Sequence, residues 1–473
     1  MMDLINEHGI QLAFGLLGAL SVFVASYALP ERYPIALLVL MLPFQLIASR
    51  YGTLNVGMVY LTFAAFLFQG RLREVPYLLP TSLVVLAYLL SVATSIPSTY
   101  GQQVIYLFNV FSGFAFFYLL FNHFRRFPDP QFVLKLLIGL DVAVLLFFAV
   151  QITLGFDAVN VFGVSEWSVG RNLEDKGRLL GPFGPAGPNA GFLVLQCLIL
   201  GYALMRLPGL TTRALLVALL FANVAMLIAT GSRGGFLALI FGAAMFLIVF
   251  RRTLGAARVI TAFAAGAVSV VIAGLIIVTY TPFDTLFTRL AGTEFQGLVP
   301  DSRSGWFEVI ERIPDALTFG HGPRIVLEYM TPRFLREVYI GYPHNLYLFL
   351  LYSLGLVGFI AWMAWFATAG LHWLRASRWE RAQDMASEFP RLGVVVLLTF
   401  LFDSMKIEFL RFQVVDYQHY VFTLLAIFSA FSVHSLQRYR QPVTTRLAAR
   451  PAVAGGAGAL SPAGALGRTP TAG

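Results

Sequence analysis

Long apolar segments recur along most of this chain, and short polar segments separate them. A helix needs about 20 consecutive apolar residues to cross the hydrocarbon core of a bilayer. The pattern predicts an all-α polytopic membrane protein with about 12–13 transmembrane helices, because the second, third and twelfth segments are short and one of them could be re-entrant. The predicted spans are 9–29, 33–49, 55–70, 78–96, 103–122, 132–154, 188–206, 212–230, 234–250, 257–280, 344–370, 391–406 and 412–435.

Arginines in the loops predict the orientation of these helices, because cytoplasmic loops carry an excess of Arg and Lys. The segments 156–187, 231–233 and 281–343 alternate with arginine-rich segments, so they are predicted to lie outside and the C-terminus inside. The side of the N-terminus depends on the helix count. The inner set contains Arg125, Arg126, Arg206, Arg213, Arg251, Arg252, Arg258, Arg375, Arg378, Arg381 and Arg391.

The long outer loop is predicted to contain two amphipathic helices. Asp301 or Ser302 could cap the first, and residues 324–338 are predicted to form the second. Such a pair could lie on the membrane surface as a lid. The first helix would carry on one face the residues Trp306, Ile310, Ile313 and Leu317.

The order of these segments divides the chain into five regions. The last region is rich in Ala, Gly, Pro and Thr from about residue 441 onward and is predicted to be disordered. The regions are N-terminal transmembrane helices over 1–155, transmembrane helices with arginine motifs over 156–280, the large outer loop over 281–343, C-terminal transmembrane helices over 344–437 and a cytoplasmic tail over 438–473.

The composition supports the membrane class and narrows the partners. Of the 473 residues, 58% are hydrophobic and 12% are charged, whereas soluble domains are about 25% charged. The net charge of +9 is attributed to arginines that anchor cytoplasmic loops beside the lipid bilayer, so no nucleic-acid partner is expected. A single cysteine, Cys197, excludes an intrachain disulfide and a cysteine metal cluster.

Two arginine motifs border apolar segments on the predicted outer side. Arg178 begins a segment rich in Gly and Pro that leads into a helix at about Pro188; the alternative is a membrane-edge turn with a snorkelling arginine. Arg233 lies in the short turn Thr230–Gly235, close to the hydrocarbon. An unpaired charge at membrane depth costs about 2.5–3.5 kcal/mol. An anionic ligand would be one partner for Arg233, and a distant acid such as Asp403 would be another.

The long loop and its end add further candidates. Arg303 and Trp306 lie about one helical turn apart, so both could face a glycan or phosphate, or could belong to an ordinary surface helix. His344, followed by Asn345, opens the next apolar helix, whose dipole favours the neutral imidazole that a general base requires. The alternative roles are a helix cap or a buried hydrogen bond. His321, on a predicted turn, is a second candidate histidine.

The helices that begin near residues 188, 233 and 344 are predicted to start at the same face. Helix N-termini attract anions through their free N–H groups and dipole, and arginine binds phosphate through two donors at once. With Arg178, Arg233 and Arg303, these helix starts could hold a pyrophosphate. The sequence has no paired carboxylates placed for a metal, no Walker loop and no Cys/His cluster, so a metal-independent site without a cofactor is predicted.

The motifs over residues 175–360, taken in order, resemble the O-antigen ligase and polysaccharide polymerase superfamily. They are Arg-x-x-Gly-x-Phe-Gly…Pro-Asn, Thr-Gly-Ser-Arg-Gly, Ser-Arg…Trp…Phe-Gly-x-Gly and His-Asn-x-Tyr-Leu…Gly-Leu-x-Gly. Members of that family often carry Gln or Glu a turn or two after the His-Asn pair, where this chain has Phe349–Ser353. The resemblance therefore assigns no helper carboxylate to this chain.

The resemblance implies a multi-pass glycosyltransferase of the bacterial inner membrane with its active site facing the periplasm. Such enzymes transfer a glycan from an undecaprenyl-pyrophosphate carrier to an acceptor hydroxyl. By this resemblance Arg178 and Arg233 would bind the pyrophosphate, Arg303 would be a weaker contact, and His344 would activate the acceptor, with inversion and without a metal. The acceptor stays open between lipid A core, a carrier-linked repeat unit and a protein hydroxyl. Further candidates for substrate contacts are Asn345 and Trp306.

A transporter of a small anion such as bicarbonate is the alternative from another class, since many helices with intramembrane arginines suit either function. Transporters often contain internal repeats with matched broken helices. This sequence has no repeat with a clear period, and its motifs gather on one side. A structural membrane scaffold is a third possibility, which leaves Arg233 unexplained.

Overall fold

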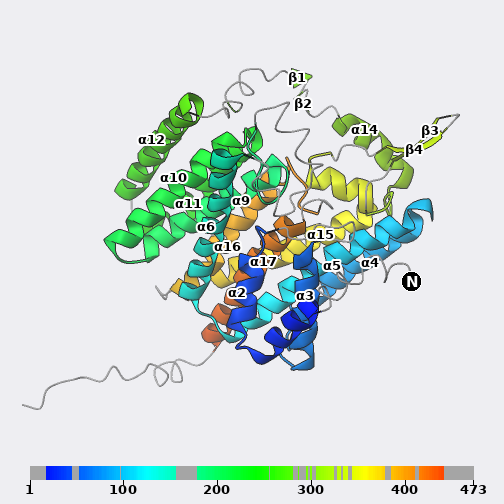
Figure 1. The fold of residues 1–473 in the computed structure, drawn as a ribbon, viewed down its shortest axis with the longest axis horizontal. Helices are drawn as coiled ribbons and strands as arrows, with labels where there is room; N and C mark the ends of the chain where they lie inside the picture. Colours follow the sequence, from blue (N-terminus) through cyan, green and yellow to red (C-terminus); the bar gives the residue numbers. More distant parts are fainter. Residues whose placement is uncertain are drawn as a thin grey trace, which may run out of the picture.

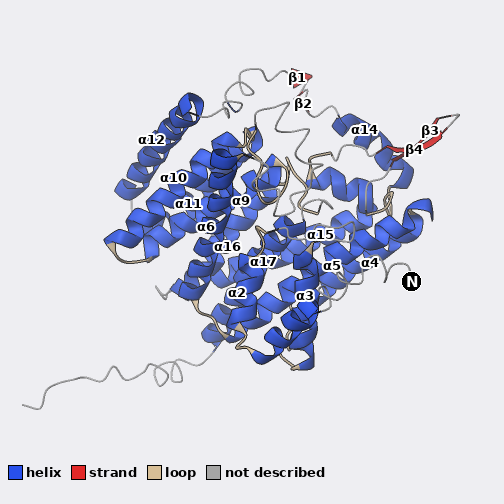
Figure 2. Cartoon of the chain, viewed as in Figure 1, coloured by secondary structure: helices blue, strands red, loops and turns tan. Residues whose placement is uncertain are grey.

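The computed structural model is a bundle of long helices with short elements at one end (Figures 1 and 2). Among the described residues, eight helices are long and apolar enough to cross a membrane, and four shorter apolar helices accompany them. The predicted all-α polytopic membrane fold is confirmed. The structure describes residues 17–44, 53–95, 97–155, 178–254, 256–280, 286, 295–296, 299–300, 305–323, 327–331, 334–338, 343–378, 385–410 and 415–440.

The helices follow the predicted spans in order. The first predicted span contains a helix over Leu17–Ala28. The second, 33–49, is helical only over Arg32–Leu40 in its described part, about 14 Å of helix, which is too short to cross the membrane. The others are α3 (Leu54–Phe68), α4 (Leu78–Thr94), α5 (Tyr100–Arg126), α6 (Pro130–Leu154), α9 (Ala186–Arg206), α10 (Leu210–Ala229), α11 (Arg233–Leu254), α12 (Ala256–Tyr280), α15 (Leu346–Arg378), α16 (Met385–Asp403) and α17 (Val415–Arg440); Arg32–Leu40 is α2.

The centre of the bundle is the close packing of α5 against α17. A Cβ added at Gly113 of α5 would come within 2.6 Å of the Phe422 ring, so glycine is what lets these helices approach. Polar groups join them inside: Ser112 Oγ lies 2.8 Å from His419 Nε2, and Gln418 Nε2 donates to the Val110 carbonyl at 3.0 Å. Helices in lipid associate through such small residues and hydrogen bonds.

The two ends of the bundle differ in charge. The lower end in Figure 1, where α5 and α17 finish, holds the partly buried Glu31 with Arg71 at 3.3 Å and Arg126 at 2.6 Å. Burial alone would raise the pKa of the Glu31 carboxyl, but its hydrogen bond to His123 and the two guanidinium groups hold that pKa below its usual range. Arg206, at the end of α9, pairs with Glu388 at the start of α16. Arg126 and Arg206, which belong to the arginines predicted to lie in cytoplasmic loops, are therefore at the same end of the bundle.

The long loop lies at the upper end of the bundle and agrees with prediction in part (Figure 1). The first amphipathic helix is present as α14 (Gly305–Arg312), continued by the 3-10 turn η3 (Ile313–Ala316). The prediction of a second helix over 324–338 is wrong, because that segment pairs as an antiparallel hairpin. Pro332 lies between its strands in the sequence, and proline breaks a helix interior. The strands are β3 (Leu327–Thr331) and β4 (Phe334–Val338), and a second hairpin joins β1 (Phe295–Gln296) and β2 (Val299–Pro300).

The loop is attached to the bundle where α15 is interrupted at Gly355, whose φ is 66° and ψ is −168°. Residues 317–322 of the loop lie against this break, an arrangement called here the loop–α15 contact. Backbone groups that the interruption releases from the helix find new partners there, as a membrane environment demands. The hydrogen bonds are His321 N to Tyr352 O at 2.9 Å, Gly322 N to Ser353 O at 3.1 Å, Leu356 N to Leu317 O at 2.7 Å and Val357 N to Thr318 O at 3.2 Å.

Candidate functional site

Three helices begin around the turn that follows α16, at residues 403–407. The first N–H of α15, from Leu346, donates to the Ser404 carbonyl at 2.8 Å. Early in α9, a Cβ added at Gly187 would lie 2.6 Å from the Ile407 side chain. At the start of α11, a Cβ added at Gly234 would lie 2.6 Å from the Lys406 side chain. The N-termini of α9, α11 and α15 therefore meet at one place.

The two arginine motifs lie side by side at this place. Leu179 N donates to the Ala229 carbonyl at 3.1 Å, which aligns the segment before α9 with the last turn of α10. Next to it, Arg178 Nε donates to the Thr230 carbonyl at 2.9 Å. Thr230 opens the turn that carries Arg233, the first residue of α11. Sequence positions 178 and 233 are thus held together through one short turn.

The Gly- and Pro-rich segment after Arg178 takes its shape from Asn189. The Asn189 amide oxygen accepts from Phe183 N at 3.1 Å, and its nitrogen donates to the Gly184 and Pro185 carbonyls, both at 2.9 Å. A Cβ at Gly181 would lie 2.2 Å from that amide oxygen, so only glycine fits there. The segment is an ordered turn that presents Arg178 and begins α9 at Ala186, close to the predicted start at Pro188.

The sequence analysis did not identify Lys406, a further cationic residue where the three helices begin. Its Nζ lies 2.8 Å from Asp403 Oδ1 and 3.4 Å from Ser232 Oγ, while Ser232 Oγ also accepts from Gly235 N at 3.2 Å and so caps α11. A Cβ at Gly235 would lie 2.9 Å from Lys406 Nζ, which explains why two glycines follow Arg233. The sequence contained a signal for this ion pair, because Asp403 and Lys406 lie three residues apart at the end of an apolar segment.

We expect Lys406→Gln to lower the free energy of unfolding by about 3 kcal/mol, because it leaves the carboxylate of Asp403, 3% exposed, without its cation. Asp403→Asn alone should also destabilise the protein. The double variant should recover most of the loss. Thermal unfolding of the purified protein in detergent measures all three, as a double-mutant cycle. Additive losses in the double variant would contradict the pairing.

His344 is presented to solvent by an unusual backbone. Its φ is 50°, in the left-handed region, and its side chain is exposed. The following residue, Asn345, caps α15: its side-chain oxygen accepts from Tyr347 N at 2.9 Å and Leu348 N at 3.2 Å. The capping alternative therefore applies to Asn345. Non-glycine residues hold this conformation only where the surroundings impose it, and such residues gather at functional sites.

The remaining predicted residues lie above α15 or outside the described part. Trp306, in the first turn of α14, donates its indole N–H to the Pro343 carbonyl, so α14 lies next to His344. His321 belongs to the loop–α15 contact: its ring stacks on Tyr352 with centroids 4.5 Å apart, and its Nε2 lies 2.9 Å from the Arg312 carbonyl. Arg303 lies outside the described residues.

Part of the chain around this site is similar to a known protein family. Residues 215–363 match the model of the Wzy_C family, described as O-antigen ligase. This stretch is similar to that family and covers less than half of the chain. The matched stretch includes Arg233, Trp306 and His344, whereas Arg178 and Lys406 lie outside it and join the site through the fold. No curated protein matches the chain. The O-antigen ligase match supports a glycosyl-transfer role at a membrane, as the sequence motifs predicted.

Proposed function

We propose that this O-antigen ligase-like protein transfers a glycan from undecaprenyl pyrophosphate to an acceptor hydroxyl, and that the reaction occurs where α9, α11 and α15 begin. The observation that carries the proposal is the meeting of three helix N-termini at the 403–407 turn, with three cationic residues on that turn or on the neighbouring turn that begins α11. The cations are Arg178, Arg233 and Lys406. By the distribution of arginines, this end of the bundle faces the periplasm.

The pyrophosphate would be bound by the turn between α10 and α11. Arg233 is half-buried at the first position of α11, where free backbone N–H groups and the helix dipole both favour an anion. Arg178 lies across the same turn, with its Nε bound to Thr230, and its guanidinium carries further N–H donors. Lys406 lies over the glycines of α11 and adds positive charge. These groups stabilise the charge that develops on the leaving pyrophosphate.

His344 is the proposed base. Its exposed imidazole would take the proton from the acceptor hydroxyl, whose oxygen forms a bond to the anomeric carbon. The bond between that carbon and the pyrophosphate oxygen breaks, and the lipid pyrophosphate leaves with the electron pair. Displacement in one step inverts the anomeric centre. The leaving group is already an anion, so it requires electrostatic stabilisation and no proton.

The long loop would cover the sugars. Trp306 is held over the start of α15 by its bond to Pro343, and an indole face suits contact with a sugar ring. Arg303 precedes α14 in the sequence by two residues and would contribute a further cation. Asn345 would act on the substrate only through the helix start that it caps.

Arg233→Gln tests the pyrophosphate site. We expect glycan transfer to fall by about 10²-fold or more, because a cation facing the developing charge is lost. The matched control is Arg251→Gln, an exposed arginine in the last turn of the same helix, at the opposite end. Glycan laddering in cells that make equal amounts of each variant measures the effect. Full product from the Arg233 variant would overturn the assignment.

A further inference from the structure

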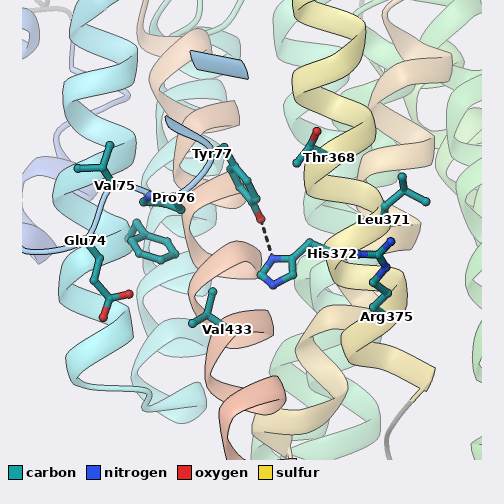
Figure 3. A pocket seen from close by; sticks show the side chains of 10 residues that line it. Glu74, Val75, Pro76, Tyr77, Thr368, Leu371, His372, Arg375 and Val433 are labelled. Atoms are coloured by element: carbon teal, nitrogen blue, oxygen red, sulfur yellow. Dashed lines mark hydrogen bonds between the residues drawn. The ribbon is translucent and has the colours of Figure 1, made fainter. Parts of the chain in front are cut away.

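A cavity lies at the lower end of the bundle, opposite the candidate site. It measures about 680 Å³ and opens between the segment before α4, the second half of α15 and the neighbouring α5 and α17. This is within the size range of small-molecule binding sites. Figure 3 shows its lining, with Tyr77 and His372 in the middle. Neither the O-antigen ligase match nor the proposed reaction assigns a function to this cavity.

Tyr77 forms the inner part of the cavity in a strained conformation. Its φ is 57°, and Tyr77 and His344 are the two non-glycine residues of the described chain in the left-handed region. Its hydroxyl lies 3.0 Å from His372 Nδ1 and 3.2 Å from Ser429 Oγ. These contacts tie the start of α4 to α15 and α17. Strain of this kind is retained where the surroundings require a particular side-chain position.

The cavity carries opposite charges on its two sides. Glu74 lies on one side and Arg375 on the other (Figure 3). Arg125 pairs with Glu74 at 3.5 Å, but the Glu74 side chain is still 48% exposed. The Arg375 side chain is exposed and makes no ion pair with another residue of the described ranges. The cavity therefore offers one accessible anion and one accessible cation, with Tyr77 and His372 between them.

The surroundings of the cavity are apolar and face outward. Val75 is 53% exposed and Leu78 is 61% exposed on one side, and Leu371 is 54% exposed on the other. Arg125, one of the arginines of the lower end, contacts Glu74 of the cavity, and in membrane proteins such arginines lie at the cytoplasmic headgroup layer. A ligand with a charged head and apolar chains would match both parts of this surface.

We propose that this cavity binds the headgroup of a zwitterionic phospholipid from the inner leaflet, with its phosphate on Arg375 and its primary ammonium on Glu74. The charge pattern selects phosphatidylethanolamine, since an ammonium donates hydrogen bonds to a carboxylate and a quaternary amine cannot. Its acyl chains follow the exposed apolar side chains beside the cavity. The bound lipid bridges the start of α4 and the end of α15.

Native mass spectrometry of the full-length purified protein tests the proposal. Dioleoyl phosphatidylethanolamine, phosphatidylcholine and phosphatidylglycerol are added separately at equal concentration. We expect about fivefold greater retention of phosphatidylethanolamine than of either other lipid, the effect of about one net hydrogen bond. Arg375→Gln should lower retention of all three lipids, and Glu74→Gln should remove only the preference for phosphatidylethanolamine. Arg251→Gln, an exposed arginine at the same end but outside the cavity, is the control.

Two results would overturn the proposal. Equal retention of the three lipids by the unaltered protein would show that no headgroup is recognised. A preference that survives both Glu74→Gln and Arg375→Gln would place the lipid elsewhere. Both residues are exposed, so the variants should keep the melting temperature of the lipid-free protein.

Discussion

His344→Asn is expected to reduce glycan transfer by about 10²–10⁴-fold, the usual contribution of a general base, while the protein stays folded. The residue has a φ of 50°, and asparagine is among the few residues that tolerate the left-handed region. The substitution therefore keeps the backbone that leads into α15 and removes only the imidazole. Transfer by purified protein in detergent, with a lipid-pyrophosphate-linked glycan as donor, measures the loss directly.

Two further substitutions separate chemistry from backbone strain at this position. His344→Gly also accepts a positive φ, so it should lose transfer to the same extent as His344→Asn. His344→Ala adds strain and should be less stable than either. If the asparagine and glycine variants kept full transfer, His344 would be no base. If only the alanine variant lost transfer, the role of the residue would be conformational.

Gly355→Ala is expected to lower the free energy of unfolding by about 3 kcal/mol or more, the upper range for overpacking and strained backbone. A Cβ there would lie 2.4 Å from the backbone of Thr318, and φ is 66°. Gly320→Ala on the facing segment should act alike, because its Cβ would lie 2.3 Å from the backbone of Ser353. Both substitutions separate the long loop from α15, so glycan transfer should also be lost.

Thermal unfolding and limited proteolysis of the loop measure this effect. The matched control is Gly57→Ala in α3, where a Cβ meets no atom within 4 Å. That substitution should be neutral or slightly stabilising, because alanine favours a helix. A Gly355 variant as stable and as protease-resistant as the Gly57 variant would contradict the loop–α15 contact.

The helical fold follows from the sequence because apolar length alone decides which segments can cross a membrane. The start of α9 and the position of α14 were also predictable, from Pro188 and from the apolar period around Trp306. The hairpin over residues 327–338 was missed because charges and apolar residues alternate there in a way that suits either structure. Pro332 was the signal against a helix.

The site was partly predictable, and the limits have a physical cause. Arg178 and Arg233 were identified as charges at the edges of apolar segments, and the structure brings them to one turn. The spacing of Asp403 and Lys406 indicated an ion pair, but the place of Lys406 beside α11 depends on how the helices pack, which that spacing does not give. Asn189 and Asn345 belong to the motifs, but their side chains form hydrogen bonds with nearby backbone groups. A residue of a motif can therefore shape the backbone without touching a substrate. The assignment of His344 stays a prediction.

Photo-crosslinking tests most directly whether the three helix starts form one pyrophosphate site. The probe is a polyprenyl pyrophosphate with a diazirine next to the pyrophosphate, applied to the purified full-length protein and displaced by the unlabelled lipid. We expect competed adducts within residues 178–181, 230–235, 344–347 and 403–407, and their loss in Arg233→Gln. Competed adducts confined to the lower end of the bundle, or unchanged by Arg233→Gln, would contradict it.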